Sequence, residues 1–402
     1  MKPLEGIRVI DLTSFLAAPT AARILGEWGA DVIKVEAPKS DPARTQAAVF
    51  NMPYSDEENP AFDIANANKR FVCINLKNEV GKKIIYKLLE TADVLLTNYR
   101  TKALVKLGLS YEEISKRFPR IVFAQILGFG QKGPEKDTAG FDATAYVARG
   151  GLLGSLNERG ESPINSVNGY GDFQCSMCLA GGVAAAIVGR QKTGKGDKVT
   201  VSLHHTALFM MNIAVVSAQY GNKYPKSRKE VVNPFNNSYK SKDGRWFIFC
   251  APEYDRDFGK VMTMLDRSDI VDDSNFNTIG EVNRRHKNRE IIDIISKQME
   301  KKDINELAQL FKKNDVPFEK GYTPDEILND KQAWANDCLR NVKYEDTGNE
   351  RILVTGPVRM ESIGDPDIRP SKALGYHTDE ILKELGYSAD EIDTMHTDGA
   401  VK

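Results

Sequence analysis

Apolar runs and amphipathic patterns alternate along the first part of the chain. Residues 8–12 form a short, mostly apolar run that is typical of a buried strand. Pro19 then opens a helical spacing of apolar residues that ends at Gly29, and residues 31–36 form a second strand-like run. This order predicts a β-α-β unit.

The same alternation continues to about residue 127. Strand patterns are found at residues 70–76, 93–97 and 121–127, with a helical pattern from Asn78 to Ala92 between the first two. Regular alternation of strands and helices favours an α/β fold with a Rossmann-like, mostly parallel sheet. Ligands of such sheets bind at the carboxyl ends of the strands. The expected binding loops are residues 14–19, 99–106 and 128–133.

A second, smaller unit is expected after about residue 220. With 402 residues, the chain exceeds the usual size of one hydrophobic core. Residues 220–236 are polar and contain proline, which is typical of a linker. A strand pattern at residues 245–250 and several helical patterns follow. We therefore expect the N-terminal part of a large domain at residues 1–220, and a linker with a small α+β domain at residues 221–330.

Composition argues against several classes of partner. The formal net charge is −1 at pH 7, so neither nucleic acid nor an acidic membrane surface is an expected partner. Residues 177–188, the longest apolar run, are too short to span a bilayer, and no signal-type segment is found near Met1. We therefore expect a soluble, cytoplasmic protein.

The sequence also predicts no metal and no tightly bound cofactor. Five cysteines are too few and too scattered for a disulfide framework. Cys175 and Cys178 form a C-x-x-C pair, but no second pair and no nearby pair of histidines completes a metal site, so buried thiols are the better interpretation. Residues 13–19 contain no glycine, and the dinucleotide fingerprint of nicotinamide enzymes is therefore absent.

The residues with the clearest chemical meaning surround Asp172. A Gly-Tyr-Gly turn precedes this residue, and an apolar, alanine-rich helical run follows it and ends near Gly194. One interpretation is that Asp172 caps the helix, since Asp satisfies free backbone N–H groups at helix starts. The other is that the positive end of the helix keeps an accessible carboxylate ionised, so that it can act as a nucleophile. The residues alone leave both interpretations open.

A family resemblance favours the second interpretation. Residues 171–182 and 192–208, GDFQCSMCLAGG and KTGKGDKVTVSLHHTAL, resemble the nucleophile region of the class III CoA-transferases. Other segments that resemble signatures of this family, in the family's order, are residues 3–36, 66–70, 97–104, 140–142 and 374–387. The resemblance covers nearly the whole chain and implies that Asp172 is the catalytic aspartate. It implies a coenzyme A thioester as co-substrate.

The resemblance also implies where CoA binds. The residues assigned to the CoA site are Ala17, Ala18, Lys69, Arg70, Asn98, Tyr99, Ala103, Lys106 and Asp142. Among these, the Lys and Arg side chains are the expected partners of the CoA phosphates. Donors for the oxyanion of the reaction are expected among backbone N–H groups near Asp172 or in residues 15–18.

Assembly and substrate are likewise implied by resemblance alone. The family forms an interlocked homodimer, in which residues 331–402 would return to the large domain. Residues 99–113, 122–142, 148–156 and 233–243 resemble the 2-hydroxyacyl branch of the family. This branch moves CoA from an acyl-CoA or 2-enoyl-CoA to an (R)-2-hydroxy acid and supplies a 2-hydroxyacyl-CoA dehydratase. The first candidate acid is 2-hydroxyisocaproate (2-hydroxy-4-methylpentanoate) of leucine fermentation, and the alternative is phenyllactate.

Two other functions compete with CoA transfer. Acyl-CoA racemases resemble these proteins, but they have a histidine in a G-H-D motif where this chain has Phe141, which cannot transfer protons. A non-catalytic acyl-CoA-binding protein would have no need of Asp172. Both alternatives are therefore disfavoured.

Overall fold

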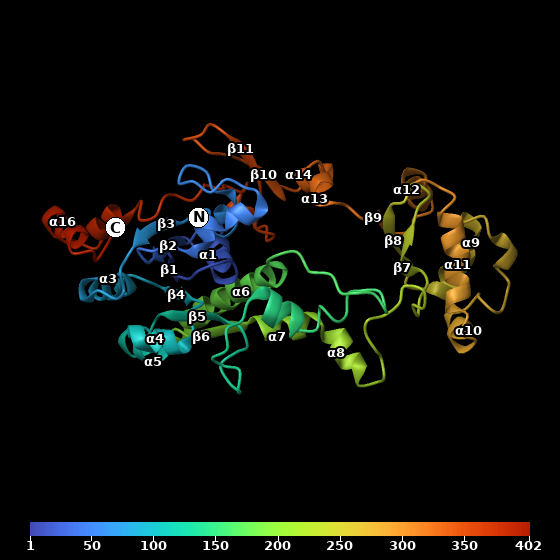
Figure 1. Ribbon diagram of the computed structural model, residues 1–402, viewed down its shortest axis with the longest axis horizontal. Helices are drawn as coiled ribbons and strands as arrows, with labels where there is room; N and C mark the ends of the chain where they lie inside the picture. The colour runs from blue at the N-terminus through green and yellow to red at the C-terminus, as the bar shows by residue number, and fades with distance from the viewer. The chain divides into compact units, whose positions relative to one another are not determined.

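The computed structural model describes residues 1–402 and divides into two compact units (Figure 1). The first unit contains residues 1–153, 165–216 and 330–402, and the second contains residues 154–164 and 217–329. The C-terminal segment is thus part of the first unit. No sequence pattern indicated that residues 154–164 belong to the second unit.

A six-stranded sheet forms the centre of the first unit, with the strand order β3-β2-β1-β4-β5-β6. Every neighbouring pair in it is parallel. The strands are β1 (Arg8–Leu12), β2 (Asp31–Glu36), β3 (Arg70–Cys73), β4 (Val94–Thr97), β5 (Val122–Leu127) and β6 (Lys198–Ser202). The winding of the chain reverses between β1 and β4, and the carboxyl ends of these two strands mark the place where α/β sheets bind ligands.

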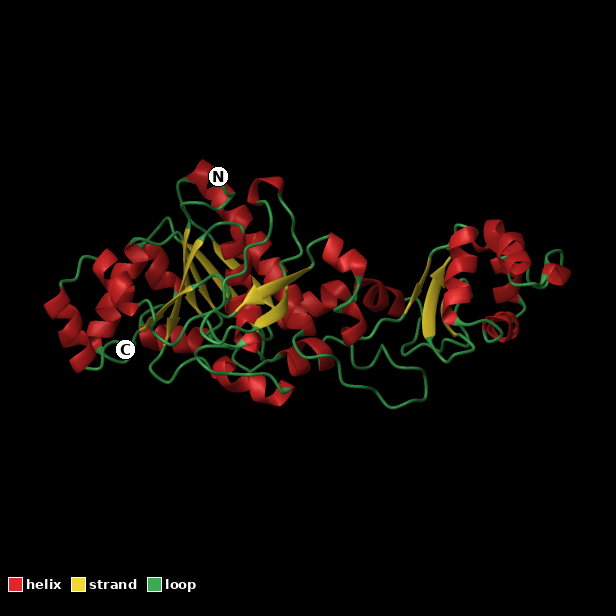
Figure 2. Cartoon of the chain, turned by 90° about the horizontal axis from the view of Figure 1, so that it is seen from above, coloured by secondary structure: helices red, strands yellow, loops and turns green.

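Helices cover both faces of this sheet (Figure 2). Successive side chains of a strand point to opposite faces, so Val9 packs with α1 and α6, whereas Ile10 packs with α3, α15 and α16. The helices of this unit include α1 (Ala17–Glu27), α2 (Pro60–Asn66), α3 (Glu79–Glu90), α4 (Thr101–Leu107), α5 (Tyr111–Arg117), α6 (Tyr170–Thr193), α7 (Leu203–Met210), α14 (Lys331–Ala335), α15 (Thr378–Glu384) and α16 (Ala389–Thr397). The predicted α/β fold with a Rossmann-like parallel sheet is confirmed.

Shorter elements complete the first unit. They are the 3₁₀ helices η1 (Pro42–Phe50) and η4 (Glu361–Ile363), the π-helical turn η2 (Asp142–Ala148), and the antiparallel hairpin of β10 (Leu339–Lys343) and β11 (Glu350–Val354). The hairpin packs beside α2 and was not predicted from the sequence. Helix α8 (Asn212–Ala218) lies where the chain passes to the second unit.

Helix α6 carries Asp172 and is the longest helix. Its 24 residues are long and apolar enough to cross a membrane by length and composition alone. Leu179 and Val183, however, are buried against the sheet with α1, as expected of a core helix. Gly182 permits α6 to lie close to β6, because a Cβ added at this glycine would lie 2.7 Å from Val199 Cγ1.

The second unit is an α+β arrangement with an aromatic core. Strands β7 (Asn236–Lys240), β8 (Trp246–Cys250) and β9 (Phe318–Lys320) form an antiparallel sheet in sequence order. Its helices are α9 (Tyr254–Met264), η3 (Ser268–Ile270), α10 (Ile279–Arg284), α11 (Asn288–Met299), α12 (Ile304–Lys313) and α13 (Pro324–Ile327). Phe235 packs against Tyr254 in this core, with tilted rings whose centroids are 4.4 Å apart.

Candidate functional site

Loops from the carboxyl ends of neighbouring strands meet at the switch point. The Ser14 N–H donates to Asn98 Oδ1 at 3.0 Å, and Asn98 Nδ2 donates to the Ser14 carbonyl at 2.7 Å, which ties the loop after β1 to the loop after β4. Phe15 packs edge-on against Phe141, with ring centroids 5.6 Å apart, and so joins the loop that follows β5. The expected binding edge is therefore one connected surface.

Asp172 lies in the first turn of α6, at this same edge of the sheet. The residue at the cap of α6 is Gly169, whose φ of +78° suits glycine, and Asp172 is three residues further on. No backbone or side-chain group donates a hydrogen bond to the Asp172 carboxylate. The interpretation of Asp172 as the helix cap is therefore wrong. Its carboxylate makes no hydrogen bond within the protein and is therefore available to a substrate.

Burial and a neighbouring carboxylate set the charge of Asp172. Burial, and then the negative charge of Asp142, raise the pKa of Asp172 to about 7. The second interpretation of the sequence predicted the opposite effect, namely that the positive end of α6 keeps this carboxylate ionised. At this position the loss of hydration outweighs the helix dipole, because the dipole is worth only about 0.3–1 kcal/mol at an exposed helix end. Near neutral pH, Asp172 is present in both ionisation states.

Asp142 accepts a backbone N–H group at the start of α6. Its side chain is 9% exposed, and Oδ1 accepts the Gly171 N–H at 2.8 Å. A side chain at position 171 would overlap the Tyr146 ring, so glycine allows the first turn of α6 to lie against η2. Asp142 was expected among the CoA contacts. The structure instead turns this carboxylate toward the helix that carries Asp172.

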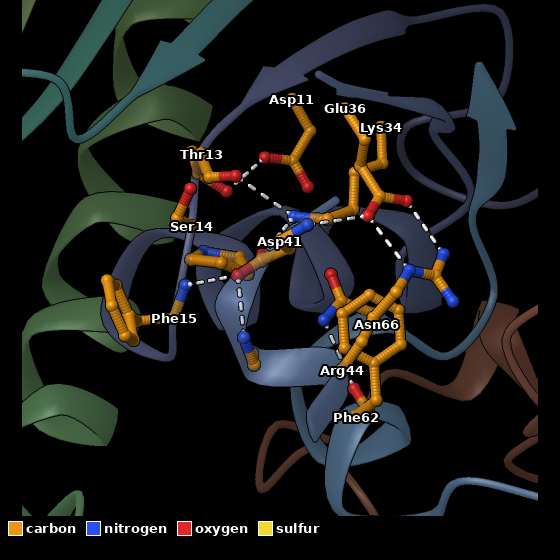
Figure 3. A network of polar contacts seen from close by, with 12 residues as sticks. Asp11, Thr13, Ser14, Phe15, Lys34, Glu36, Asp41, Arg44, Phe62 and Asn66 are labelled. Carbon is orange, nitrogen blue, oxygen red and sulfur yellow. Dashed lines mark hydrogen bonds and ion pairs between the residues drawn. The ribbon is translucent and has the colours of Figure 1, made fainter. Parts of the chain in front are cut away.

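A cluster of six buried charges lies beside the loop after β1, and Figure 3 labels all of its members except Lys69. The members of this six-charge cluster are Asp11, Lys34, Glu36, Asp41, Arg44 and Lys69. Three carboxylates face three cations in pairs, with separations of 2.7 Å for Lys69–Asp11, 2.9 Å for Lys34–Asp41 and 2.7 Å for Arg44–Glu36. Charges this deeply buried are stable only when they are paired and hydrogen-bonded.

The six-charge cluster holds the loop after β1 in place. Lys34 Nζ donates to the Thr13 carbonyl at 3.1 Å, and the Phe15 N–H donates to Asp41 Oδ1 at 3.2 Å (Figure 3). Phe15 has a φ of +67°, in the left-handed region that costs a residue with a side chain roughly 1–3 kcal/mol. Such a conformation persists only where the surroundings impose it, and it places the Phe15 ring against Phe141.

Lys69 and Arg70 do not reach the binding edge. Lys69 Nζ is enclosed by Asp11 Oδ2, the Pro19 carbonyl and Asn66 Oδ1, each within 2.8 Å. Burial, opposed by Asp11, lowers the pKa of this ammonium to about 8. Arg70 begins β3 at the opposite, amino-terminal edge of the sheet, where it pairs with Asp31. The expectation that these two cations hold the CoA phosphates is therefore not met.

The remaining expected CoA residues lie near the switch point. Asn98 and Tyr99 follow β4 directly, and Ala103 and Lys106 are on α4, where Lys106 is exposed and has no carboxylate within ion-pair distance. The other two, Ala17 and Ala18, begin α1 and are buried.

Helices α1 and α6 are joined at their starts. Ser176 Oγ donates to the Ala17 carbonyl at 2.6 Å. This bond couples the first turn of α1 to the turn of α6 that follows Asp172, and it fixes the two helix starts relative to each other.

The sequence predicted that both thiols of the C-x-x-C pair are buried, and this prediction is wrong for Cys178. Cys175 is buried, Cys178 is exposed, and all five thiols are free. No group of three or more His, Cys, Asp or Glu side chains is arranged to hold a metal ion.

A family model and two relatives match nearly the whole chain. Residues 4–378 match the model of CoA-transferase family III. The chain is 46% identical to cinnamoyl-CoA:phenyllactate CoA-transferase of Clostridium sporogenes, over 98% of this chain and 96% of that protein. It is 42% identical to (R)-2-hydroxy-4-methylpentanoate CoA-transferase of Clostridioides difficile, over 99% of each.

A solved structure has the same architecture throughout. The crystal structure of a CAIB/BAIF family protein from Brucella suis superposes with a TM-score of 0.79 at 25% identity, over 96% of this chain and 99% of that chain. The sequence resemblance to the class III CoA-transferases is thereby confirmed. The chain belongs to CoA-transferase family III and is a class III CoA-transferase.

Proposed function

We propose that this enzyme moves CoA from an acyl-CoA or 2-enoyl-CoA to an (R)-2-hydroxy acid, with 2-hydroxyisocaproate as the first candidate acid. The observation that carries the proposal is the half-buried carboxylate of Asp172, which has no hydrogen-bond donor and lies at the binding edge. The two relatives that share 46% and 42% of their residues with this chain are both named for transfer to a 2-hydroxy acid.

Asp172 acts as a covalent nucleophile in this proposal. Its carboxylate attacks the thioester carbonyl of the donor, and the C–S bond breaks to give a mixed anhydride and CoA thiolate. The thiolate then attacks the Asp172 carbonyl, which forms an aspartyl-CoA thioester and releases the donor acid as a carboxylate. One difficult displacement is divided into easier steps.

The second half of the reaction repeats these steps with the acceptor. The carboxylate of the 2-hydroxy acid attacks the aspartyl thioester, and CoA thiolate leaves again as a second anhydride forms. The thiolate attacks the acyl carbonyl of the acceptor, which gives the new acyl-CoA and restores the Asp172 carboxylate. No electron or proton is gained or lost in the complete cycle.

Free N–H groups at the start of α1 are suited to the oxyanions of these steps. The N–H of Phe15 donates to Asp41, and the N–H of Gly171 donates to Asp142, so neither is free. The N–H groups of Ala17 and Ala18 lie in the first turn of α1, where a helix leaves its donors without partners. We assign the oxyanion site to these two groups.

CoA occupies the switch point as a co-substrate and not as a tightly bound cofactor. Asn98, Tyr99 and Ala103 line its path, and Lys106 supplies a point charge for a phosphate group. The cytoplasm is the proposed location, and a 2-hydroxyacyl-CoA dehydratase is the proposed next enzyme for the product.

Phenyllactate is the second candidate acid. The relative named for phenyllactate shares 46% of its residues with this chain, compared with 42% for the relative named for (R)-2-hydroxy-4-methylpentanoate. Racemisation remains disfavoured, because Phe141 provides no second acid or base beside Asp172.

We also propose a homodimer. An apolar surface without a cover extends along α7 and α8, where Phe209 is 68% and Ile213 is 84% exposed. The other exposed apolar side chains of this segment are Leu208, Met210, Val215 and Val216. Contiguous apolar surface of this kind marks interaction sites in soluble proteins, and a second copy of the chain would bury it. A stable monomer in light scattering across micromolar dilution would contradict this assembly.

A CoA-exchange assay tests the proposed reaction. The purified enzyme is incubated with isocaproyl-CoA and either (R)-2-hydroxyisocaproate or (R)-phenyllactate, and both acyl-CoA products are measured by liquid chromatography. We expect transfer to 2-hydroxyisocaproate, with release of one isocaproate for each CoA moved. Failure to transfer CoA to either acid, with isocaproyl-CoA or cinnamoyl-CoA as donor, would contradict the proposal.

A further inference from the structure

An apolar cavity lies in the first unit beside the start of α6. Its volume is about 480 Å³, within the range of small-molecule sites. Apolar side chains from separate segments form its walls, among them Ile24, Met52, Ile64, Phe173, Met177 and Leu353. None of the residues assigned to catalysis or to CoA binding lines this cavity.

The cavity wall contains the residue that follows Asp172 in the sequence. Phe173 directly follows Asp172, and Met177 lies one turn further along α6. A Cβ added at Gly169 would lie 3.1 Å from Phe173 Cε2 and 3.2 Å from Leu16 Cδ1, so these two side chains meet at the cap of the helix. The cavity wall therefore starts within the turn that carries Asp172.

The charged groups in the cavity wall are already occupied. Arg23 Nε pairs with Glu27 Oε1 at 2.8 Å, and its other nitrogens donate to the carbonyls of Ile64 at 2.7 Å and Val354 at 2.9 Å. Glu27 Oε2 accepts the Gly356 N–H at 3.0 Å. Thr20 adds a buried hydroxyl but no charge. An anionic group placed in this cavity would find no free cation, and burying an unpaired charge is strongly unfavourable.

We infer that this cavity holds the apolar side chain of the acid that receives CoA, and that it selects monocarboxylic acids with a bulky apolar side chain over short acids and dicarboxylic acids. The inference rests on the proposed CoA transfer through Asp172. It adds that Met177 and Ile64, from α6 and α2, determine specificity. Binding energy from the side chain would position the carboxylate beside Asp172.

Two filling variants test the assignment. Met177→Trp and Ile64→Trp reduce the cavity from two different helices, and the acids compared are (R)-2-hydroxyisocaproate and (R)-lactate. We expect the ratio of kcat/KM for 2-hydroxyisocaproate to kcat/KM for lactate to fall by about 10-fold or more in each variant, since a methylene-sized change in a pocket alters rates by roughly 10–200-fold. Val188→Trp is the matched control, because Val188 is exposed on the same helix and lies outside the cavity.

A gain of function tests the charge argument independently. For the wild type we expect kcat/KM with 2-hydroxyglutarate to be at least about 100-fold below that with 2-hydroxyisocaproate. Ile64→Lys supplies an ammonium to the cavity and should raise the relative use of 2-hydroxyglutarate by about 10-fold, which a neutral Ile64→Met variant should not do.

The outcomes distinguish failure of the cavity assignment from failure of the proposed CoA transfer. If the wild type transfers CoA, but both tryptophan variants keep the wild-type ratio of acids, the cavity does not hold the side chain and the inference is overturned, while the proposed function stands. Efficient use of 2-hydroxyglutarate by the wild type would also overturn the inference. If the wild type transfers CoA to no 2-hydroxy acid, the proposed function itself fails, and the inference fails with it.

Discussion

Two groups of buried or half-buried carboxylates lie near the binding edge, and they differ in what surrounds them. In the six-charge cluster, each of three carboxylates has a cation within 2.9 Å. Asp142 and Asp172 have no cation, and Asp172 has no hydrogen-bond donor either. Paired charges fix a loop in one conformation, whereas the unpaired carboxylate acquires a raised pKa and remains able to react. The paired carboxylates thus stabilise the loop after β1, whereas the half-buried Asp172 is suited to the proposed role of nucleophile.

The largest expected effect follows from removing the proposed nucleophile. Asp172→Asn keeps the size of the side chain but cannot form an anhydride, so CoA transfer should fall by at least about 10³-fold. The assay is the exchange of CoA between isocaproyl-CoA and (R)-2-hydroxyisocaproate. Thermal unfolding should be cooperative, as for the wild type, because no hydrogen bond is lost. Near-normal turnover in a preparation free of wild-type protein would refute the covalent mechanism.

Breaking an ion pair in the six-charge cluster should instead lower the free energy of unfolding. Lys69→Met leaves Asp11 buried without its cation, which should lower the free energy of unfolding by about 3–5 kcal/mol in urea titrations. Adding Asp11→Asn to this variant should restore part of the loss, because no unpaired charge then remains.

An exposed ion pair provides the control for the cluster. Lys82 pairs with Glu79 at 2.7 Å on the surface of α3, and Lys82→Met should leave the midpoint of unfolding almost unchanged. Equal effects of Lys69→Met and Lys82→Met would show that the buried cluster has no special role in stability.

A smaller effect is expected when the neighbour of the nucleophile is neutralised. Asp172 must be ionised to react, so wild-type activity should rise with pH through about 7. Asp142→Asn retains an oxygen that accepts the Gly171 N–H but removes a negative charge, and the pKa of Asp172 should therefore fall. The midpoint of the rise in kcat/KM should move to lower pH. An unchanged midpoint in this variant would mean that burial alone sets the pKa.

The smallest effect is expected at Phe141. Phe141→His supplies a base near pH 7, but racemisation also requires that base and Asp172 to lie on either side of the α-carbon. We expect no deuterium exchange from solvent into the α-carbon of an acyl-CoA in the wild type and at most slow exchange in the variant. Rapid exchange by the wild type, without an acceptor acid, would favour a racemase.

The sequence predicted features that depend on local patterns. The runs at residues 8–12 and 31–36 coincide with β1 and β2, because a buried parallel strand requires an apolar run whatever its neighbours are. The position of Asp172 at the start of a helix was predicted in the same way. The group that caps this helix was not predicted, since the acceptor of the Gly171 N–H is Asp142, a residue 29 positions earlier.

Features that depend on tertiary contacts could not be predicted from the sequence. Lys69 has the sequence of a surface lysine beside an arginine, yet its partner Asp11 is 58 positions away and encloses it in the core. The hairpin of β10 and β11 has too little apolar pattern to be recognised. The cavity beside α6 combines side chains from α1, α2, α6 and β11, and no single segment of the sequence describes it.

Trapping of the aspartyl intermediate tests the central claim most directly. The enzyme is incubated with isocaproyl-CoA and hydroxylamine, digested, and examined by peptide mass spectrometry. We expect a hydroxamate on Asp172 in the wild type, and no adduct in Asp172→Asn or in wild type without acyl-CoA. A wild-type enzyme that turns over under these conditions but carries no adduct, or carries it on another residue, would contradict the account.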